Sequence, residues 1–475
     1  MLSGLASPAW LGVALKRRCD PPADVARPEL LTSIVESMLT SMSDEARMAL
    51  RERLEERARR RDGPLVFSMA CWGTDVCFSA AQALTSSLPK ILHVDEEALR
   101  FERGFSCESD DLKQQFLQKV QGAQTVFTEI ANLGNTMSTN SVTEQEEIIG
   151  KMDIFAVTLS CKDMSNLKKS GLADKSSSPG SSGGAFQGVL SICEAHQPKL
   201  VIMENAAASS DADGEVVDKN WAHISQSFDS IGYTVHRKFL DASHYGFPQS
   251  RGRVFLCAVR VEHPRTPESV LKDFDHAYAG IAGIEPTPLK DFFLSGEQVQ
   301  MWNETSSKRC KEGAGESAGA AAAWASTRAS LFCEKKFHWP PSTDEAHAAR
   351  YADPSQPLSA REAEVLILNE KCHPLDPDSS DEEALDLSQD IRRVKIFKNK
   401  TCCLTAGVVL WLRRERRRLR GEEMLRLQGF WPQDRTRLLT FSDVLLKDLA
   451  ANAVNAGAFL ACLLAALQVV EFSSS

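Results

Sequence analysis

The feature that most constrains the fold is an alternation, from Pro64 onward, of short apolar runs with segments long enough to form helices. Each run has the length of a strand and is rich in Val, Ile and Phe, as buried strands are. The runs are PLVFSMA, FERGFSC, QTVFTE, MDIFAVTLS, PKLVIMEN, YTVHRKFLD and RVFLCAV. Strands that alternate with helices predict a parallel sheet covered on both faces, and therefore an α/β fold.

Changes in composition and in hydrophobic pattern divide the chain into four segments. Residues 1–63 predict a helical N-terminal extension whose last stretch, RERLEERARRR, is interpreted as an exposed helix end. Residues 64–264 hold the α/β domain, and residues 265–395 predict a smaller irregular domain with a low-complexity insertion. Order returns in residues 396–475, where AFLACLLAAL has the length of a buried helix, so we expect no membrane span.

Composition narrows the choice of partners. The chain has 475 residues, 43% of them hydrophobic, and a formal net charge of −9. This balance argues against a basic coat over the whole surface but leaves room for a local basic face. The stretch RRERRRLR, residues 413–420, either contacts phosphates, forms an exposed helix face or serves as a nuclear import signal.

The cysteines and the N-terminus bear on the compartment. The 13 cysteines stand at irregular intervals without a C-x-x-C pair, so we expect reduced thiols and no structural metal. The first nineteen residues contain no acid and carry Lys16, Arg17 and Arg18 near their end, which is similar to an organelle transit peptide. A frayed terminus explains them equally simply.

Polar groups stand where several of the predicted strands end. They are Cys71–Asp75, Glu108, Glu129, Cys161 and Glu204-Asn205. Because ligands of such sheets bind at the carboxyl ends of the strands, we expect these groups to converge on one crevice. The Ser/Gly-rich residues 174–184 are either a mobile flap over that crevice or an ordinary surface loop.

These groups suit thiol chemistry assisted by a carboxylate. Cys161 needs a neighbouring cation to act as a thiolate, and Arg251 and Arg253 of PQSRGRVF are candidates to supply it. Arginines two apart on an extended strand point to the same face, so both can reach one anionic group. Glu204 is the better acid–base candidate, since no histidine stands at a matching strand end and His244 lies in a loop.

The ordered motifs resemble those of the cytosine-C5 DNA methyltransferases. DASHYGFPQSRGRVFLCAV is similar to the family's Q-x-R-x-R motif, with Gln249, Arg251 and Arg253 in place. LRGEEMLRLQGF is similar to the segment that ends in R-L-Q-G-F, and DLAANAVNAGAF to the closing G-N-A-V motif, with Ala451 in place of the glycine. The resemblance implies a Rossmann-like S-adenosylmethionine-dependent methyltransferase sheet with a smaller irregular target-recognition domain.

The resemblance also implies a role for each catalytic candidate. Cys161 would attack C6 of a cytosine flipped out of its stack, and Glu204 would hold N3 and the exocyclic amine of that base. Arg253, with Arg251 behind it, would bind O2 of the base or the adjacent phosphate and favour the thiolate. Beta-elimination would then free the enzyme.

S-adenosylmethionine is the implied cofactor, and no metal is implied. Its binding residues would be Phe67, Gly73, Glu108, Glu129 and Asn452. Gly73 would let the backbone approach the methionine part, and Glu108 would accept both ribose hydroxyls. Glu129, or Ile130 in its place, would lie near the adenine amine, while Phe67 and Asn452 would help line the pocket.

The sequence departs from the family pattern at three places. Ser160 stands where a proline usually precedes the nucleophile, Ala206 replaces the valine of Glu-Asn-Val, and the F-x-G-x-G loop survives only as FSMACWGTD. The degenerate loop favours an alternative, a catalytically silent scaffold that binds nucleic acid or protein. Retention of the catalytic cysteine, glutamate and two arginines opposes it.

DNA is the partner that the resemblance implies. RNA is the other candidate, because base flipping and thiol addition serve either polymer. The nucleus is the favoured compartment, with an organelle as the alternative that the acid-free N-terminus suggests.

Overall fold

The computed structural model describes residues 28–158, 182–206, 214–307, 358–389 and 393–472. The chain forms two compact units. Unit 1 consists of Met1–Thr287, Leu425–Leu438 and Leu449–Ser475. Unit 2 consists of Pro288–Met424 and Leu439–Asp448. These bounds differ from the division expected at residues 264 and 395.

Unit 1 is built on a nine-stranded sheet with the order β5-β4-β3-β2-β1-β6-β7-β9-β8. Its strands are β1 (Leu65–Ala70), β2 (Phe101–Cys107), β3 (Val126–Phe127), β4 (Met137–Asn140), β5 (Gln145–Ile148), β6 (Ile154–Thr158), β7 (Leu200–Ala206), β8 (Tyr233–Asp241) and β9 (Gly252–Arg260). All seven apolar runs form strands, as predicted. The strand order changes direction at β1 and β6, which is the switch point where α/β sheets bind ligands.

The expectation of a wholly parallel sheet is wrong at β9. This strand runs antiparallel to both β7 and β8. Residues 242–251, which link β8 to β9, hold only the short turn η4 (Ala242–His244). A parallel crossover needs a dozen or more residues, usually a helix, so this link permits only an antiparallel return.

The hairpin of β4 and β5 was not predicted either. It pairs antiparallel with β3 and extends the sheet at that edge. Its sequences, MSTN and QEEI, are mostly polar, so they lack the apolar signal that identified the other strands.

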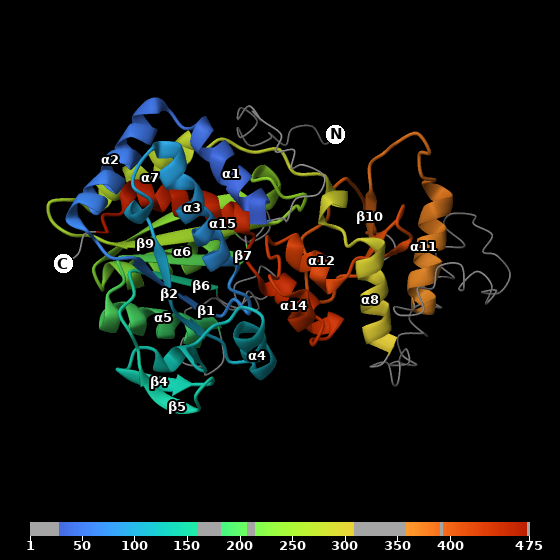
Figure 1. Ribbon diagram of the computed structural model, residues 1–475, viewed down its shortest axis with the longest axis horizontal. Helices are drawn as coiled ribbons and strands as arrows, with labels where there is room; N and C mark the ends of the chain where they lie inside the picture. The colour runs from blue at the N-terminus through green and yellow to red at the C-terminus, as the bar shows by residue number, and fades with distance from the viewer. Residues whose placement is uncertain (1–27, 159–181, 207–213, 308–357, 390–392, 473–475) are drawn as a thin grey trace. The chain divides into compact units, whose positions relative to one another are not determined.

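Helices cover both faces of this sheet (Figure 1). One layer comprises α1 (Pro28–Ser41), α3 (Val76–Leu92), α7 (Pro267–Gly280) and α15 (Ala456–Val469). The opposite layer comprises α5 (Ser182–His196) and α6 (Gly214–Asp229), whose Phe186 and Phe228 pack on the sheet with Phe155. The doubly covered α/β arrangement is therefore confirmed.

The C-terminal apolar stretch is a core helix. Asp443–Val469 is long and apolar enough to cross a membrane by length and composition, but 89% of its most apolar window is buried. In α15 all residues but Gln468 are buried, and they contact α3, α7 and β9. The predicted buried helix is confirmed.

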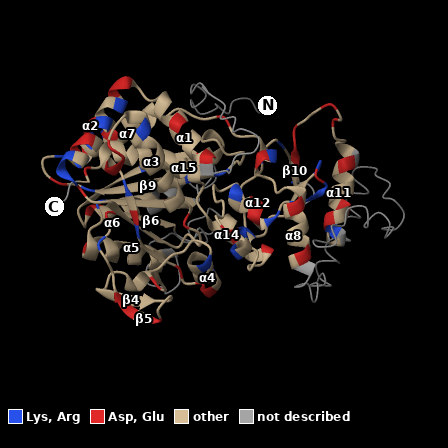
Figure 2. Ribbon diagram, in the orientation of Figure 1, with Lys and Arg blue, Asp and Glu red and all other residues tan. Residues whose placement is uncertain are grey.

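The N-terminal extension is helical, as predicted, over α1 and α2 (Asp44–Arg60). α1 buries Ile34, Val35 and Met38, so it belongs to the core of unit 1. Acidic and basic side chains are mixed along α2 (Figure 2), where Arg59 and Arg60 both lie 2.7 Å from Glu56. This pairing within one helix leaves no face of a single sign.

Unit 2 holds a four-stranded antiparallel sheet with the order β11-β10-β12-β13. The strands are β10 (Glu383–Asp386), β11 (Ile396–Lys398), β12 (Leu410–Leu412) and β13 (Arg417–Arg418). Its helices include α8 (Gly296–Ser307), α11 (Ala360–Cys372) and the start of α12 (Gly421–Arg426). Val365, Leu366, Leu385 and Trp411 form its small core.

Candidate active site

The carboxyl ends of β6 and β7 lie beside the first residues of β9. In the parallel pair, Thr158 of β6 lies opposite Glu204 of β7. In the antiparallel pair, Ala206 of β7 lies opposite Arg253 of β9. Because β9 begins where β7 ends, its first arginine reaches the strand-end carboxylate. The antiparallel direction that the sequence did not predict is what assembles this group.

Glu204 is held at both carboxylate oxygens. Arg253 Nε lies 2.9 Å from Oε1, and Arg251 Nη2 lies 3.9 Å from the same oxygen. Thr158 Oγ1 donates to Oε2 over 3.1 Å. The side chain of Glu204 is 4% exposed, and its Oε1 faces the arginines as an ion pair, without a hydrogen bond from a described residue. The predicted Arg251 and Arg253 and the newly identified Thr158 therefore all lie against the carboxylate of Glu204.

Arg251 also holds the main chain of a distant segment. Its side chain is 2% exposed, and Nη2 donates to the carbonyl oxygens of Ala451 over 3.1 Å and Ala453 over 2.8 Å. In the A-N-A-V motif, Ala451 lies in the last turn of α14 (Asp443–Asn452) and Ala453 follows that helix. Arg251 therefore supports the scaffold, whereas Arg253, 18% exposed, is the arginine more accessible to a ligand.

The turn before α15 is fastened by two further side chains. Gln428 Nε2 donates to Ala450 O over 2.9 Å, and Asn455 Nδ2 donates to Leu427 O over 3.1 Å. Asn455 Oδ1 also caps α15. Gly429, with φ +93°, approaches Ala456 so closely that an added Cβ would lie 2.4 Å from the Ala456 Cβ. The three motifs recognised in the sequence therefore meet at one turn.

The loop after β1 has an unusual backbone. Cys71 and Gly73 both have φ +63°, the left-handed region that favours glycine. A Cβ added to Gly73 would lie 2.9 Å from Leu449 Cδ2 and 3.2 Å from Lys113 Cδ. Gly73 is thus required by a close approach as well as by its torsion angle.

Asp75 anchors this loop at the start of α3. Its carboxylate lies 3.0 Å from Arg103 Nη1 and accepts from Ser106 Oγ over 3.1 Å. Burial raises the pKa of Asp75, and Arg103 and Ser106 oppose that shift. The loop lacks the family's glycines but is fixed by this ion pair.

Glu108 lies at the carboxyl end of β2, next to that loop. Its Oε1 accepts from the amides of Ser109 and Asp110 over 3.0 and 3.2 Å. A Cβ at Gly73 would lie 3.8 Å from its other oxygen, Oε2. Burial raises the pKa of Glu108, while Lys113 and the two amides oppose the rise. A carboxylate beside a close-approach glycine fits a ligand with a hydroxylated sugar and an amino-acid part.

The other predicted cofactor residues are placed differently. Glu129 is exposed at the end of β3, Ile130 packs partly against the core, and Asn452 is exposed at the end of α14. Phe67 is 0% exposed. Its ring lies 6.2 Å, centroid to centroid, from each of Phe78, Phe101 and Phe459. Its side chain packs in the core beside these rings, and its place in the lining of a cofactor pocket stays a prediction.

Cys161 and Ser160 lie outside the described residues, as do residues 174–181 of the Ser/Gly-rich stretch. Cys161 follows Thr158 by three residues, and three extended residues span at most about 11 Å. Its role as the nucleophile stays a prediction. Within the part of the chain that the structure covers, no cluster of three or more His, Cys, Asp or Glu side chains is arranged to hold a metal.

The arginine stretch of unit 2 is not a helix. RRERRRLR turns from β12 into β13, and alternate side chains of such a hairpin point inward. Arg413, Arg417 and Arg420 are 2%, 8% and 1% exposed. The expected exposed helix face is therefore wrong, and these three arginines are not placed to form a phosphate-binding patch.

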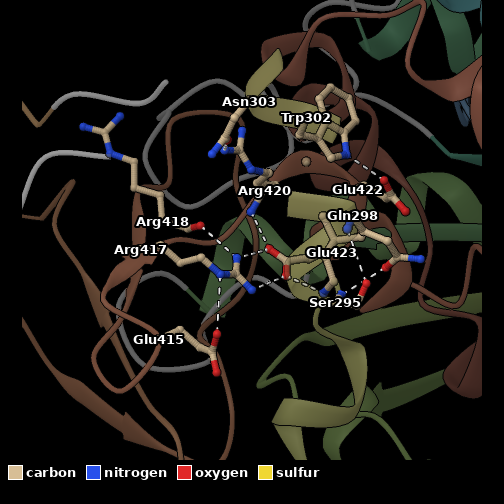
Figure 3. Close-up of polar contacts among 12 residues, drawn as sticks. Ser295, Gln298, Trp302, Asn303, Glu415, Arg417, Arg418, Arg420, Glu422 and Glu423 are labelled. Carbon is tan, nitrogen blue, oxygen red and sulfur yellow. Dashed lines mark hydrogen bonds and ion pairs between the residues drawn. The ribbon is translucent and has the colours of Figure 1, made fainter. Parts of the chain in front are cut away.

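Buried polar side chains of unit 2 form a hydrogen-bonded network centred on Glu423 (Figure 3). Arg417 Nη1 and Nη2 donate to its two oxygens over 2.8 and 2.7 Å. The amides of Arg420 and Leu294 add bonds of 2.9 and 2.8 Å. The neighbouring Glu422 accepts from Trp302 Nε1 over 2.7 Å. This network joins α8, β13 and α12 inside unit 2.

Comparison with known proteins gives a family and several relatives. Residues 97–454 match the family described as C-5 cytosine-specific DNA methylase. The chain is 29% identical over 160 residues to DNA (cytosine-5-)-methyltransferase DMT5 of Cryptococcus neoformans var. grubii, which covers 34% of this chain and 6% of that protein. It is 27% identical over 148 residues to Type II methyltransferase M.MspI of Moraxella sp., which covers 30% of this chain and 33% of that protein.

Both matches therefore span well under two thirds of the relatives. Among solved structures, S. pombe Dnmt2 methyltransferase is 12% identical with a TM-score of 0.41, covering 84% of this chain and 97% of that one. Entamoeba histolytica methyltransferase EhMeth is 9% identical with a TM-score of 0.45, covering 86% and 98%. The fold is identified by the strand order and the family match.

Proposed function

Since the chain belongs to the C-5 cytosine-specific DNA methylase family, we propose that it transfers a methyl group from S-adenosylmethionine to C5 of cytosine in DNA. The observation that carries the proposal is the carboxylate of Glu204, held by Arg253 and Thr158 at the edge where the chain continues to Cys161. A scaffold without chemistry would not need a buried carboxylate in that position.

The reaction we propose uses a base flipped out of the duplex. The Cys161 thiolate adds to C6, and Glu204 holds N3 and the exocyclic amine while charge develops on the ring. C5 then takes the methyl group, loses its proton to a base or to water, and the C6–S bond breaks to restore the thiolate. Arg253 binds O2 of the base or the adjacent phosphate.

S-adenosylmethionine supplies the electrophilic methyl group, and it leaves as S-adenosylhomocysteine. We propose that Glu108 accepts from its ribose hydroxyls and that Gly73 lets the backbone approach its methionine part. Glu129 and Asn452 stay candidates for the rest of the pocket. The support is the strand-end carboxylate of Glu108, which lies beside Gly73 in the positive-φ turn after β1.

We assign DNA target recognition to unit 2, which contains residues 288–395 of the region predicted to be irregular. Its small sheet and the buried arginine network give it a fold of its own, apart from the doubly covered sheet of unit 1. The nucleus remains the favoured compartment, with an organelle as the alternative.

The test is transfer of a labelled methyl group to matched duplex DNA and structured RNA substrates. We expect label on cytosine C5 of DNA, lost in both Cys161→Ser and Glu204→Gln. Label on RNA alone would replace DNA with RNA as the substrate. A folded wild-type chain that binds S-adenosylmethionine or nucleic acid but labels neither polymer would favour the silent scaffold.

A further inference from the structure

We infer that Thr158 is a positioning residue that orients the Glu204 carboxylate toward the target base, an inference that rests on the proposed function. Thr158 ends β6 and is part-buried, three residues before the proposed nucleophile. Its hydroxyl donates to Oε2 of Glu204 over 3.1 Å. No motif in the sequence pointed to this role.

The geometry shows why one hydroxyl has this effect. Thr158 Oγ1 lies 3.1 Å from Glu204 Oε2 and 3.2 Å from the main-chain oxygen of the same residue. Its single proton can be shared between these two acceptors. The hydroxyl therefore bridges the backbone and the side-chain terminus of Glu204, which limits the rotation of the side chain between them.

Glu204 is on β7, and each of the two strands beside β7 contacts one of its carboxylate oxygens. β9 supplies Arg253 to Oε1, and β6 supplies Thr158 to Oε2. With contacts at Oε1 alone, the carboxylate can pivot about that oxygen, and the contact of Thr158 at Oε2 opposes this rotation. A β-branched side chain suits this task, since threonine has few χ1 rotamers on a strand.

Thr158 also lies close in the sequence to the proposed nucleophile. Thr158 and Cys161 are on one continuous segment, and Glu204 is on the next strand of the sheet. Ser160 stands where the family has a loop-fixing proline. The hydrogen bond of Thr158 thus links β6 to β7 three residues before the proposed nucleophile.

The test compares Thr158→Val, which keeps the shape and removes the hydroxyl, with Thr158→Ser, which keeps the hydroxyl and removes a methyl group. For Val we expect kcat to fall about tenfold to a hundredfold, the effect of losing one hydrogen bond to a charged group. KM for DNA and the affinity for S-adenosylmethionine should change less than about threefold, because neither ligand touches Thr158. Ser should restore kcat to within about threefold of wild type, because it restores the donor.

A Val variant with wild-type kcat would overturn the inference. So would equal losses in Val and Ser, because packing of the methyl group would then explain both. If the wild-type chain methylates no polymer, the proposed function fails first, and a crystal structure of Thr158→Val still decides the positioning role. The inference requires the Glu204 carboxylate to turn away from its wild-type plane, and an unchanged plane would contradict it.

Discussion

Two arginine-rich stretches of this chain use the same side chain in different ways. In unit 1, PQSRGR begins an antiparallel strand, and its Arg253 meets a carboxylate at the edge of the sheet. In unit 2, RRERRRLR forms a hairpin whose inward arginines are consumed by Glu423, Glu383 and Asn303. The denser cluster of charge is the structural one. Position at a strand end, and not the number of arginines, identifies the candidate site.

This contrast predicts opposite phenotypes. Removing a charge from the unit 2 network should lower stability, because a buried partner is left unpaired. Removing one from the unit 1 group should lower activity first, because Arg253 is partly exposed and Arg251 remains.

The largest effect is expected for Glu423→Gln. Glu423 is 0% exposed and receives four hydrogen bonds. Loss of its charge removes the buried counterion of Arg417, which should lower the free energy of unfolding by about 3–5 kcal/mol. Urea denaturation monitored by tryptophan fluorescence measures this.

Glu415→Gln is the matched control. Glu415 also faces Arg417, at 3.7 Å, but its side chain is 48% exposed. Its loss should lower the free energy of unfolding by less than about 1 kcal/mol. Equal losses in the two variants would mean that burial does not decide the strength of this network.

The second effect is expected for Arg253→Lys. An ammonium keeps the charge but cannot reproduce the guanidinium Nε contact of 2.9 Å with Glu204. We expect kcat to fall about tenfold to a hundredfold, while the free energy of unfolding changes by less than about 1 kcal/mol. A variant that unfolds before it loses activity would place Arg253 with the structural arginines of unit 2.

The third effect is a pH dependence of cofactor binding. Burial raises the pKa of Glu108 above its ordinary value, so the carboxylate takes up a proton at a higher pH than an exposed one. Only the ionised form accepts from both ribose hydroxyls. Affinity for S-adenosylmethionine should therefore be constant above that pKa and fall by about tenfold per pH unit below it.

Titration calorimetry between neutral and acidic pH measures this dependence. Glu108→Gln should bind more weakly and show no such fall, because its amide does not titrate. If the variant keeps the same slope as the wild type, another group is responsible for the dependence.

The smallest effect is expected for Arg416→Gln. Arg416 is exposed at the turn of the RRERRRLR hairpin, in contrast to the buried Arg417. The free energy of unfolding should change by less than about 0.5 kcal/mol. The slope of log affinity for DNA against log salt should fall by no more than about 1, the value of one phosphate contact. A larger change would make this hairpin a principal DNA contact.

Much of unit 1 could be predicted from the sequence because its strands are buried. Seven apolar runs identified seven strands, and the polar residues after them identified the edge that holds Glu108 and Glu204. The polar β4–β5 hairpin carried no such signal. The direction of β9 depends on the length of the link from β8, which apolar patterning does not report.

The contacts between distant segments could not be predicted. Arg251 bonds to Ala451 and Ala453, about two hundred residues away, and Thr158 bonds to a glutamate on the neighbouring strand. Such pairs depend on sheet register. The hairpin of RRERRRLR was missed for a related reason: a run of charge looks solvated until its buried partners, such as Glu383 and Glu423, are known.

Covalent trapping on a duplex that carries 5-fluorocytosine tests the attack of Cys161 on cytosine most directly. With S-adenosylmethionine present, the account predicts an adduct that survives denaturation and disappears in Cys161→Ser. Fluorine replaces the C5 proton that a base would remove, and it cannot leave as a cation. The C6–S bond therefore cannot be eliminated after methyl transfer. A wild-type adduct that persists in Cys161→Ser, or a folded chain that methylates DNA without forming any adduct, would contradict the account.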